Sequence, residues 1–179
     1  MEQKIRDFMK DKGKKVLLLD HTGDINTIYE WHRVQSARRI IFNTFILRIC
    51  KSMFMPLRLK NVIFKYILGM DIGRKAAIVP DSELDPIYPQ LISIGENSII
   101  GWKTNILCHE FTEDHIRLGR VKIGQNTLIG AFTAIRSGVT IGNNSVVAMD
   151  SFVNKDVPDN ELWGGVPAKF IKKLGKDEI

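Results

Sequence analysis

Aliphatic residues recur at every sixth position through the second half of the chain, and this period constrains the fold more than any other feature. Two insertions interrupt this six-residue spacing, one after Leu84 and one after Ile106. Ten of the hexads carry a small or β-branched residue four places after the aliphatic one, and six carry glycine directly after it. The twelve repeating positions are Ile72, Ile78, Leu84, Ile94, Ile100, Ile106, Ile123, Ile129, Ile135, Ile141, Val147 and Val153.

A period of six fits neither an α-helix, which repeats every 3.6 residues, nor an isolated strand, which repeats every two. A fixed longer period is typical of a solenoid. Each hexad can form one short strand and a turn, so that three hexads make one coil with the aliphatic side chains inside. One coil cannot bury its own apolar face, and the coils must therefore stack. Twelve hexads predict about four coils, whereas an ordinary sandwich of short strands would have irregular spacing.

The motifs resemble those of a known family. They are the Ile-Gly-x-x-Ser/Thr-x hexads, a histidine in the break after Ile106, and the ending Gly-Gly-Val-Pro-Ala-Lys at 164–169. Over roughly residues 70–173 the chain resembles the hexapeptide-repeat acyltransferases, in particular the maltose, galactoside and polysaccharide O-acetyltransferases. The resemblance implies a left-handed parallel β-helix, a homotrimer and acetyl-CoA as the acyl donor.

The sequence predicts three segments. Residues 1–71 form a basic α-helical region, with a helix from about Thr27 to Phe54, an interruption at Pro56, and a second helix over 57–68. Residues 72–158 form the β-helix, with loops at 85–91 and 109–121. Residues 159–179 form a turn and a short helix, the helix covering 170–174.

The positive charge of the chain is concentrated in its N-terminal region. Residues 1–71 hold 14 Lys and Arg against 7 Asp and Glu, whereas residues 72–179 hold 12 against 13. The two helices expected over 27–68 are apolar on one side and basic on the other. They could cap the open end of the first coil, contact an anionic membrane surface, or do both. No nucleic-acid-binding motif accompanies the charge, so no nucleic acid partner is expected.

The cellular compartment of the protein can be predicted from three features that the sequence lacks: a cysteine framework, a secretory signal and a membrane-spanning segment. Cys50 and Cys108 fit no disulfide or metal framework, which is typical of a reducing compartment. Neither a secretory signal nor an apolar run of eighteen residues is visible. The sequence therefore predicts a cytoplasmic protein, located at the inner face of the membrane if the basic helices bind lipid.

The small-residue pattern fails at Glu110, four places after Ile106. A carboxylate cannot occupy a tight, buried corner unpaired, so the chain must leave the coil there and carry His109 outward. An imidazole suits the removal of a proton from an attacking hydroxyl, and the resemblance implies the same role for His109. Because Leu84 should stack below Ile106, Asp85 should lie beneath His109.

A carboxylate usually orients a base histidine, and the candidates are Asp85, Glu110, Glu113 and Asp114. We favour Asp85 and Glu110, each to contact either the histidine or the acceptor. In the family the histidine is followed by proline and a longer loop, whereas here it is followed by Glu110. This difference concerns the acceptor side of the site and leaves the donor side unchanged.

Two other side chains near His109 invite chemical interpretations. Cys108 is its neighbour on an extended chain and should therefore face inward, as a filler rather than a nucleophile. His115 should face solvent or the acceptor. A zinc lyase resembling the γ-type carbonic anhydrases would need three histidines, and the repeat contains only His109 and His115. No metal is expected.

The resemblance also implies a donor site. The backbone amides of Ala131 and Met149 would hold the pantetheine arm, and Lys155 lies where the family has a lysine near one end of CoA. Asn154 stands where the family often has threonine. Trp163 either stacks near the adenine or packs in the fold. The basic residues expected to meet the nucleotide phosphates are Lys169 and Lys172.

Together these features predict an acetyl-CoA-dependent O-acetyltransferase that modifies a sugar hydroxyl, in surface polysaccharide biosynthesis. Its catalytic residues would be His109, Asp85 and Glu110. One alternative is an N-acetyltransferase of an amino sugar or nucleotide sugar, which can use the same scaffold. A weaker alternative is a non-catalytic β-helix that binds partner proteins.

Overall fold

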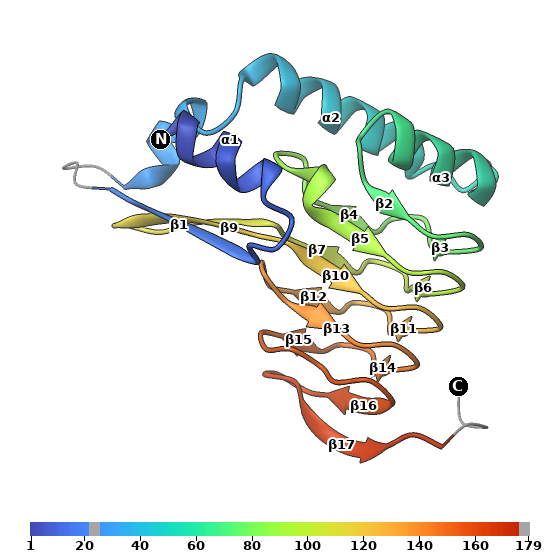
Figure 1. Cartoon of the computed structure of the whole chain (residues 1–179). Coiled ribbons are helices and arrows are strands. Elements are labelled where there is room, and N and C mark those ends of the chain that lie inside the picture. Colours follow the sequence, from blue (N-terminus) through green and yellow to red (C-terminus); the bar gives the residue numbers. More distant parts are fainter. Residues whose placement is uncertain (22–25, 176–179) are drawn as a thin grey trace.

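The computed structural model describes residues 1–21 and 26–175, apart from the side chain of Glu30. Its main body is a three-sided prism of stacked coils (Figure 1). The first side contains β2 (Asp71–Ile72), β5 (Ile92–Ile94), β10 (Val121–Ile123) and β13 (Thr140–Ile141). The second side contains β3 (Ala77–Ile78), β6 (Ile99–Ile100), β11 (Leu128–Ile129), β14 (Val146–Val147) and β16 (Glu161–Gly164). The third side contains β4 (Glu83–Leu84), β7 (Asn105–Ile106), β12 (Ala134–Ile135) and β15 (Phe152–Val153).

The register of the strands follows the hexads. On the third side Leu84 pairs with Ile106, Ile106 with Ile135, and Ile135 with Val153, all in parallel. All twelve repeating aliphatic residues are buried, at 6% exposure or less. The predicted architecture of four stacked coils with an aliphatic core is therefore confirmed.

Each regular corner bends at the residue three places after the aliphatic one. Eight such residues have a φ between 51° and 67° although they are not glycine, among them Asn97, Asn126 and Asn144. This left-handed conformation is rare for residues other than Gly, Asn and Asp. The following small residue turns inward, and at six of these eight corners its hydroxyl donates to a carbonyl oxygen of the next coil, as Thr127 Oγ1 does to that of Gly142 at 2.7 Å.

The glycines of the hexads let neighbouring coils approach each other closely. A Cβ placed on Gly130 would lie 2.4 Å from the backbone nitrogen of Met149. We therefore expect Gly130→Ala to lower the free energy of unfolding by about 1–3 kcal/mol, because backbone atoms must shift. Chemical denaturation measures this change. Gly13→Ala is the control, since its Cβ would meet only a side-chain oxygen at 3.3 Å, and an equal loss in both variants would contradict the explanation.

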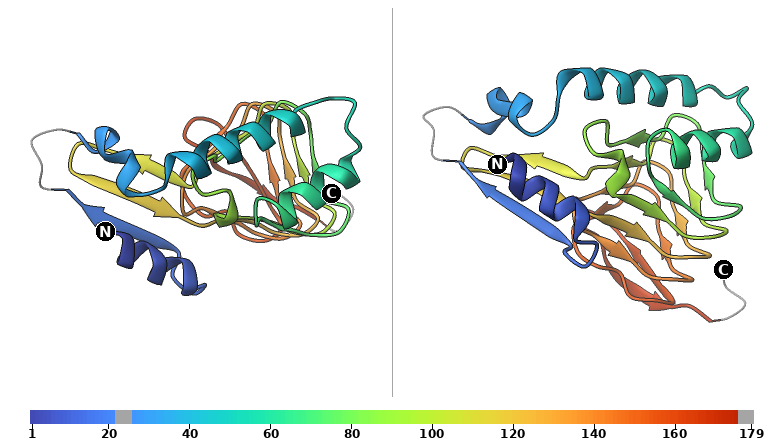
Figure 2. Two further views of the ribbon diagram at one scale, coloured as in Figure 1. Left: turned by 90° about the horizontal axis from the view of Figure 1, so that it is seen from above. Right: turned by 45° about the horizontal axis from the view of Figure 1, so that its top comes forward.

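The N-terminal region supplies four helical elements and one strand. They are α1 (Glu2–Lys10), β1 (Val16–Asp20), the 3₁₀ helix η1 (Thr27–Arg33), α2 (Ala37–Cys50) and α3 (Leu57–Tyr66). α2 and α3 lie across the N-terminal end of the prism (Figure 2), and the buried side chains Leu47 and Phe64 line a small cavity with Ile78 and Leu84 of the first coil. Of the two roles left open for these helices, the structure shows that they cap the first coil, and it also shows the predicted interruption before α3, at Pro56.

The start of the long helix was predicted too early. Thr27 is tied to the carbonyl oxygen of Thr112 through both its backbone nitrogen, at 3.2 Å, and its Oγ1, at 2.6 Å. The segment that follows is a 3₁₀ helix. The regular helix begins only at Ala37, where the Ser36 side chain accepts a hydrogen bond from the backbone nitrogen of Arg39 and caps it. No described helix is long and apolar enough to cross a membrane.

The break after Ile106 is a hairpin rather than a loop. β8 (His109–Phe111) and β9 (His115–Gly119) pair antiparallel, and β1 adds a third antiparallel strand along β9. The other break, after Leu84, contains the 3₁₀ helix η2 (Pro89–Leu91). The expectation of a loop over 109–121 was wrong, because β1 provides a partner for an alternating apolar strand that local sequence alone leaves unpaired.

The predicted C-terminal helix is also wrong. Residues Lys169–Lys173 form the strand β17, which pairs antiparallel with β16. A helix of five residues is hard to nucleate, whereas a strand satisfies the open hydrogen-bonding edge of the last coil. Residues 176–179 lie outside the described part of the chain.

Candidate functional site

His109 occupies the position at which a regular corner would bend. It stands three places after Ile106, where other coils have a left-handed residue, but here His109 is not left-handed and begins the strand β8. Its side chain is 17% exposed, and its ring lies edge-on to the Phe111 ring at a centroid distance of 5.3 Å. The imidazole is therefore held on an ordered strand at the surface of the prism rather than inside it.

Asp85 lies directly beneath His109. It follows Leu84, whose strand pairs with that of Ile106, and it is fully buried. Its Oδ2 is 2.5 Å from His109 Nδ1 and accepts the backbone N–H of Cys108 at 2.7 Å. Its Oδ1 accepts the backbone N–H groups of Ile87 and Tyr88, each at 2.8 Å. A carboxylate is an acceptor only, so the proton lies on Nδ1 and the Nε2 lone pair is left to act as a base.

The helical cap supports the loop that carries Asp85. Asn43 of α2 donates to the carbonyl oxygen of Pro86 at 2.9 Å, and the Tyr88 hydroxyl donates to the carbonyl oxygen of Val34. Burial, together with the nearby Asp85 carboxylate, raises the pKa of Tyr88, so the phenol remains a donor. Sequence reasoning missed these contacts, because they join residues about 40 to 55 positions apart that share no motif.

Glu110 points away from His109, because successive side chains of a strand face opposite ways. Its carboxylate accepts three hydrogen bonds from Arg136 and one from Ser137. The Arg117 guanidinium also lies 3.5 Å from it. Of the two carboxylates favoured from the sequence, Asp85 contacts His109, and Glu110 instead connects the hairpin to Arg136 and Ser137, which follow β12. Burial opposes ionisation of Glu110, but hydrogen bonds from Arg136 and Ser137 outweigh it and lower the pKa of Glu110.

This pKa shift predicts a loss of stability in acid. A carboxyl group whose pKa is lower in the folded state stabilises the fold above its unfolded pKa, and that contribution disappears as the pH falls through the folded value. We expect the melting temperature of the wild type to fall more between pH 7 and pH 3 than that of Glu110→Gln. Glu113→Gln, at the exposed hairpin tip, should retain the wild-type pH dependence. Parallel curves for Glu110→Gln and wild type would contradict this role.

The hairpin tip holds a second, separate imidazole. His115 Nδ1 lies 2.6 Å from Asp114 Oδ1 and 3.0 Å from Thr112 Oγ1. The hydrogen bonds from His115 and Thr112 lower the pKa of Asp114. Among the described residues, no group of three or more His, Cys, Asp or Glu side chains could hold a metal ion.

Cys108 faces inward, as predicted. Its side chain is fully buried, and burial together with the nearby Asp85 carboxylate raises the pKa of its thiol well above the usual value. A thiol that resists deprotonation is a poor nucleophile. Its backbone N–H, rather than its sulfur, serves the site by holding Asp85.

The expected donor residues lie on two different corners of the prism. Ala131 and Met149 stack on the corner between the second and third sides, where Asp150 donates to the carbonyl oxygen of Ala131. Asn154 and Lys155 follow β15 and lie on the corner from which His109 leaves. Among the described residues, neither the backbone N–H of Ala131 nor that of Met149 donates a hydrogen bond.

The remaining donor candidates lie at the C-terminal end. Lys169 and Lys172 are both exposed and belong to β17, at the far end of the prism from the helical cap (Figure 1). The Trp163 indole N–H donates to Glu161 Oε2 at 2.7 Å, and the ring packs partly against the core. Trp163 thus has a structural role whether or not it also meets an adenine.

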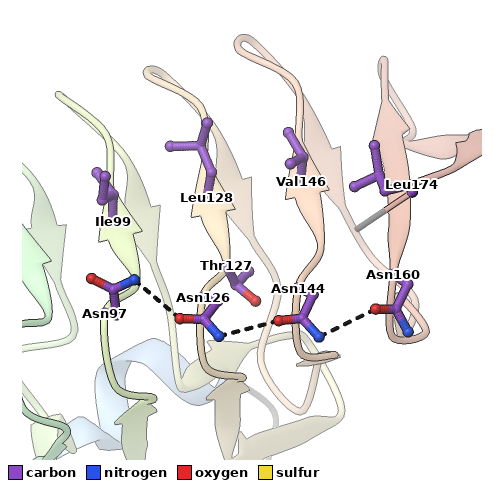
Figure 3. A pocket seen from close by; sticks show the side chains of 10 residues that line it. Asn97, Ile99, Asn126, Thr127, Leu128, Asn144, Val146, Asn160 and Leu174 are labelled. Atoms are coloured by element: carbon purple, nitrogen blue, oxygen red, sulfur yellow. Dashed lines mark hydrogen bonds between the residues drawn. The ribbon is translucent and has the colours of Figure 1, made fainter. Parts of the chain in front are cut away.

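A separate groove of about 900 Å³ runs along the second side. One wall is a ladder of asparagines, in which Asn97 donates to Asn126, Asn126 to Asn144 and Asn144 to Asn160 (Figure 3). The other wall carries the apolar side chains Ile99, Leu128, Val146 and Leu174. The described residues that line this groove include no acidic, basic or thiol side chain, and its one hydroxyl, that of Thr127, donates to the carbonyl oxygen of Gly142. We therefore place the chemistry at His109 and not in this groove.

Comparison with curated proteins identifies relatives over most of the chain. The chain is 35% identical over 144 residues to "Putative acetyltransferase YvoF" of Bacillus subtilis, covering 79% of this chain and 83% of that one. It is 42% identical over 150 residues to "Putative acetyltransferase SAR0816" of Staphylococcus aureus, covering 83% and 91%. It is 31% identical over 120 residues to the galactoside O-acetyltransferase of Escherichia coli, covering 63% and 58%.

Solved structures show the same fold. A hexapeptide-repeat acetyltransferase of Vibrio cholerae, VCA0836, solved with acetyl-CoA, superposes with a TM-score of 0.65 at 23% identity, covering 79% of this chain and 91% of that one. A maltose O-acetyltransferase of Clostridium difficile superposes with a TM-score of 0.59 at 22% identity, covering 78% and 88%.

The family model described as bacterial transferase hexapeptide (six repeats) matches residues 120–155, which contain β10 to β15. The repeats, the relatives and the shared fold agree. The chain belongs to the hexapeptide-repeat acyltransferases and has their left-handed parallel β-helix fold.

Proposed function

We propose that this protein is an acetyl-CoA-dependent O-acetyltransferase that modifies a sugar hydroxyl, in surface polysaccharide biosynthesis in the cytoplasm. The observation that carries the proposal is the pairing of His109 with the buried carboxylate of Asp85 at 2.5 Å. A sugar acceptor is supported by the names of two similar proteins, a galactoside and a maltose O-acetyltransferase.

The reaction needs one base that later becomes an acid. His109 Nε2 removes the hydroxyl proton of the acceptor as its oxygen attacks the thioester carbonyl carbon. The carbon–sulfur bond then breaks, and the imidazolium returns the proton to the leaving thiolate, so that the products are an acetyl ester and CoA. Asp85 holds the ring in place and stabilises its positive charge between these steps. No covalent acyl-enzyme is required, since positioning of the two substrates supplies much of the rate enhancement.

Donor binding is proposed to use the free amides of Ala131 and Met149, with the basic side chains of Lys155, Lys169 and Lys172 toward the nucleotide. These amides are one full side of the prism away from His109. Six residues of extended chain separate the two corners, at most about 20 Å. An acetyl-CoA molecule held at the corner of Ala131 and Met149 is therefore best placed to meet the His109 imidazole of another copy of the chain.

A homotrimer is accordingly part of the proposal. A neighbouring copy that brings its Ala131–Met149 corner to His109 would complete the site between two chains. Uncovered apolar residues on the second side, Ile99 at 45% and Leu128 at 40% exposure, support association of this kind.

The proposal is tested by thiol release from acetyl-CoA with matched pairs of acceptors, such as a glucoside and the corresponding glucosamine derivative. We expect release with the hydroxyl acceptor and an ester product that hydroxylamine cleaves. An amide product formed only with the amino sugar would favour the N-acetyltransferase alternative. No release with any acceptor would favour a non-catalytic scaffold.

A further inference from the structure

α2 and α3 expose an apolar surface on the side that faces away from the prism. Their inner sides bury Leu47, Cys50 and Phe64 against the first coil, whereas the outer sides remain uncovered (Figure 2). Phe54, between the two helices, is 96% exposed, Tyr66 is 76% exposed and Phe45 is 62% exposed. We call the following residues the outer helical face: Ile41, Phe42, Phe45, Ile49, Met53, Phe54, Leu57, Leu59, Val62 and Tyr66, all exposed.

Cations are interleaved with this apolar surface. On α2, positions 38, 41, 45 and 48 share one stripe, since residues three and four apart are neighbours on a helix. The exposed basic residues on or beside the outer helical face are Arg38, Arg39, Arg48, Arg58 and Lys65. None of these five forms an ion pair within the described part of the chain. From residue 31 to residue 70 the sequence contains no Asp or Glu.

The outer helical face carries both exposed aromatic side chains and unpaired cations, and this combination favours one binding partner over another. A second copy of the same face would bring two sets of five cations together, which is unfavourable. An anionic bilayer instead offers phosphate groups to the arginines and an acyl boundary to the apolar side chains. With 14 and 10 residues, α2 and α3 are also too short to span a bilayer.

We propose that the outer helical face docks on the surface of an anionic lipid bilayer, with α2 and α3 lying in the membrane plane. The coils then extend away from the membrane. The loop that holds Asp85 is attached to α2 by the hydrogen bond from Asn43. The active-site imidazole therefore lies close to the headgroup layer. Resting on the proposed function, this placement favours an acceptor sugar that is itself carried on a lipid.

Sedimentation with lipid vesicles tests the docking independently of activity. The full chain is mixed with vesicles of phosphatidylcholine alone or with 30 mol% phosphatidylglycerol, at 0.1 M and 0.5 M salt. We expect binding to the anionic vesicles at 0.1 M salt, and at least tenfold weaker binding at 0.5 M salt or without phosphatidylglycerol. Arg38→Glu/Arg39→Glu and, separately, Phe54→Glu should each weaken binding at least tenfold.

Phe170→Glu is the matched control, because Phe170 is a half-exposed phenylalanine at the opposite end of the prism. It should bind as the wild type does, and circular dichroism checks that each variant is folded. Wild-type protein that stays in the supernatant, or Phe54→Glu that binds like Phe170→Glu, would overturn the proposal. Association of the protein without vesicles that Phe54→Glu abolishes would also overturn it, in favour of a protein partner.

Discussion

Replacing His109 by alanine is expected to lower kcat for acetyl transfer by about 10²–10⁴-fold, the usual contribution of a general base. No other described side chain is placed to substitute for it: Cys108 is buried with a raised thiol pKa, and Glu110 is held by Arg136. The KM for acetyl-CoA should change less than threefold, because in the proposed mechanism the base contacts the acceptor hydroxyl rather than the nucleotide. Thiol release at saturating acceptor measures both constants.

His115→Ala is the matched control for this prediction, because His115 lies on the same hairpin and pairs with its own carboxylate. It should retain at least a third of the wild-type kcat. A folded His109→Ala enzyme with more than a tenth of the wild-type kcat would contradict the assignment of His109 as the base.

Asp85→Asn is expected to lower kcat by about 10²–10⁴-fold while leaving the volume of the side chain unchanged. An asparagine that donates its amide N–H to His109 Nδ1 would move the imidazole proton to Nε2, which could then no longer accept the hydroxyl proton. Three backbone N–H groups donate to the two oxygens of the Asp85 carboxylate, and one of these oxygens would be replaced by an NH₂ group that cannot accept a hydrogen bond. In addition to the fall in kcat, we therefore expect the free energy of unfolding to decrease by about 1–3 kcal/mol.

Tyr88→Phe separates the two effects of the Asp85 substitution. It removes the hydroxyl that ties the loop to Val34 but keeps the carboxylate beside His109. We expect it to destabilise the protein while lowering kcat by less than tenfold. If Tyr88→Phe and Asp85→Asn lower kcat equally, then Asp85 acts only by holding the loop, and its proposed role in fixing the imidazole proton is wrong.

The period of six was sufficient to predict the coils, their register and the place where the chain leaves them. The reason is physical: each aliphatic residue must enter a narrow core, so every sixth position is constrained independently of the rest of the chain. The same constraint predicted that Leu84 stacks under Ile106, and this register is what brings Asp85 beneath His109.

Contacts between distant segments could not be predicted in this way. β1 completes the hairpin sheet from about 100 residues away, and α2 holds the Asp85 loop through Asn43, which carries no periodic signal. The interaction of Glu110 with Arg136 was missed because it depends on which way β8 faces after it leaves the coil. The C-terminal strand was mistaken for a helix because five residues show too little of either period.

A crystal structure with CoA and an acceptor sugar tests the central claim most directly. We predict an acceptor hydroxyl about 2.6–3.2 Å from His109 Nε2, with the CoA sulfur beside it. The pantetheine carbonyl oxygens should accept hydrogen bonds from the backbone N–H groups of Ala131 and Met149 of a neighbouring copy. CoA bound in the asparagine-lined groove, or an acceptor remote from His109, would contradict it.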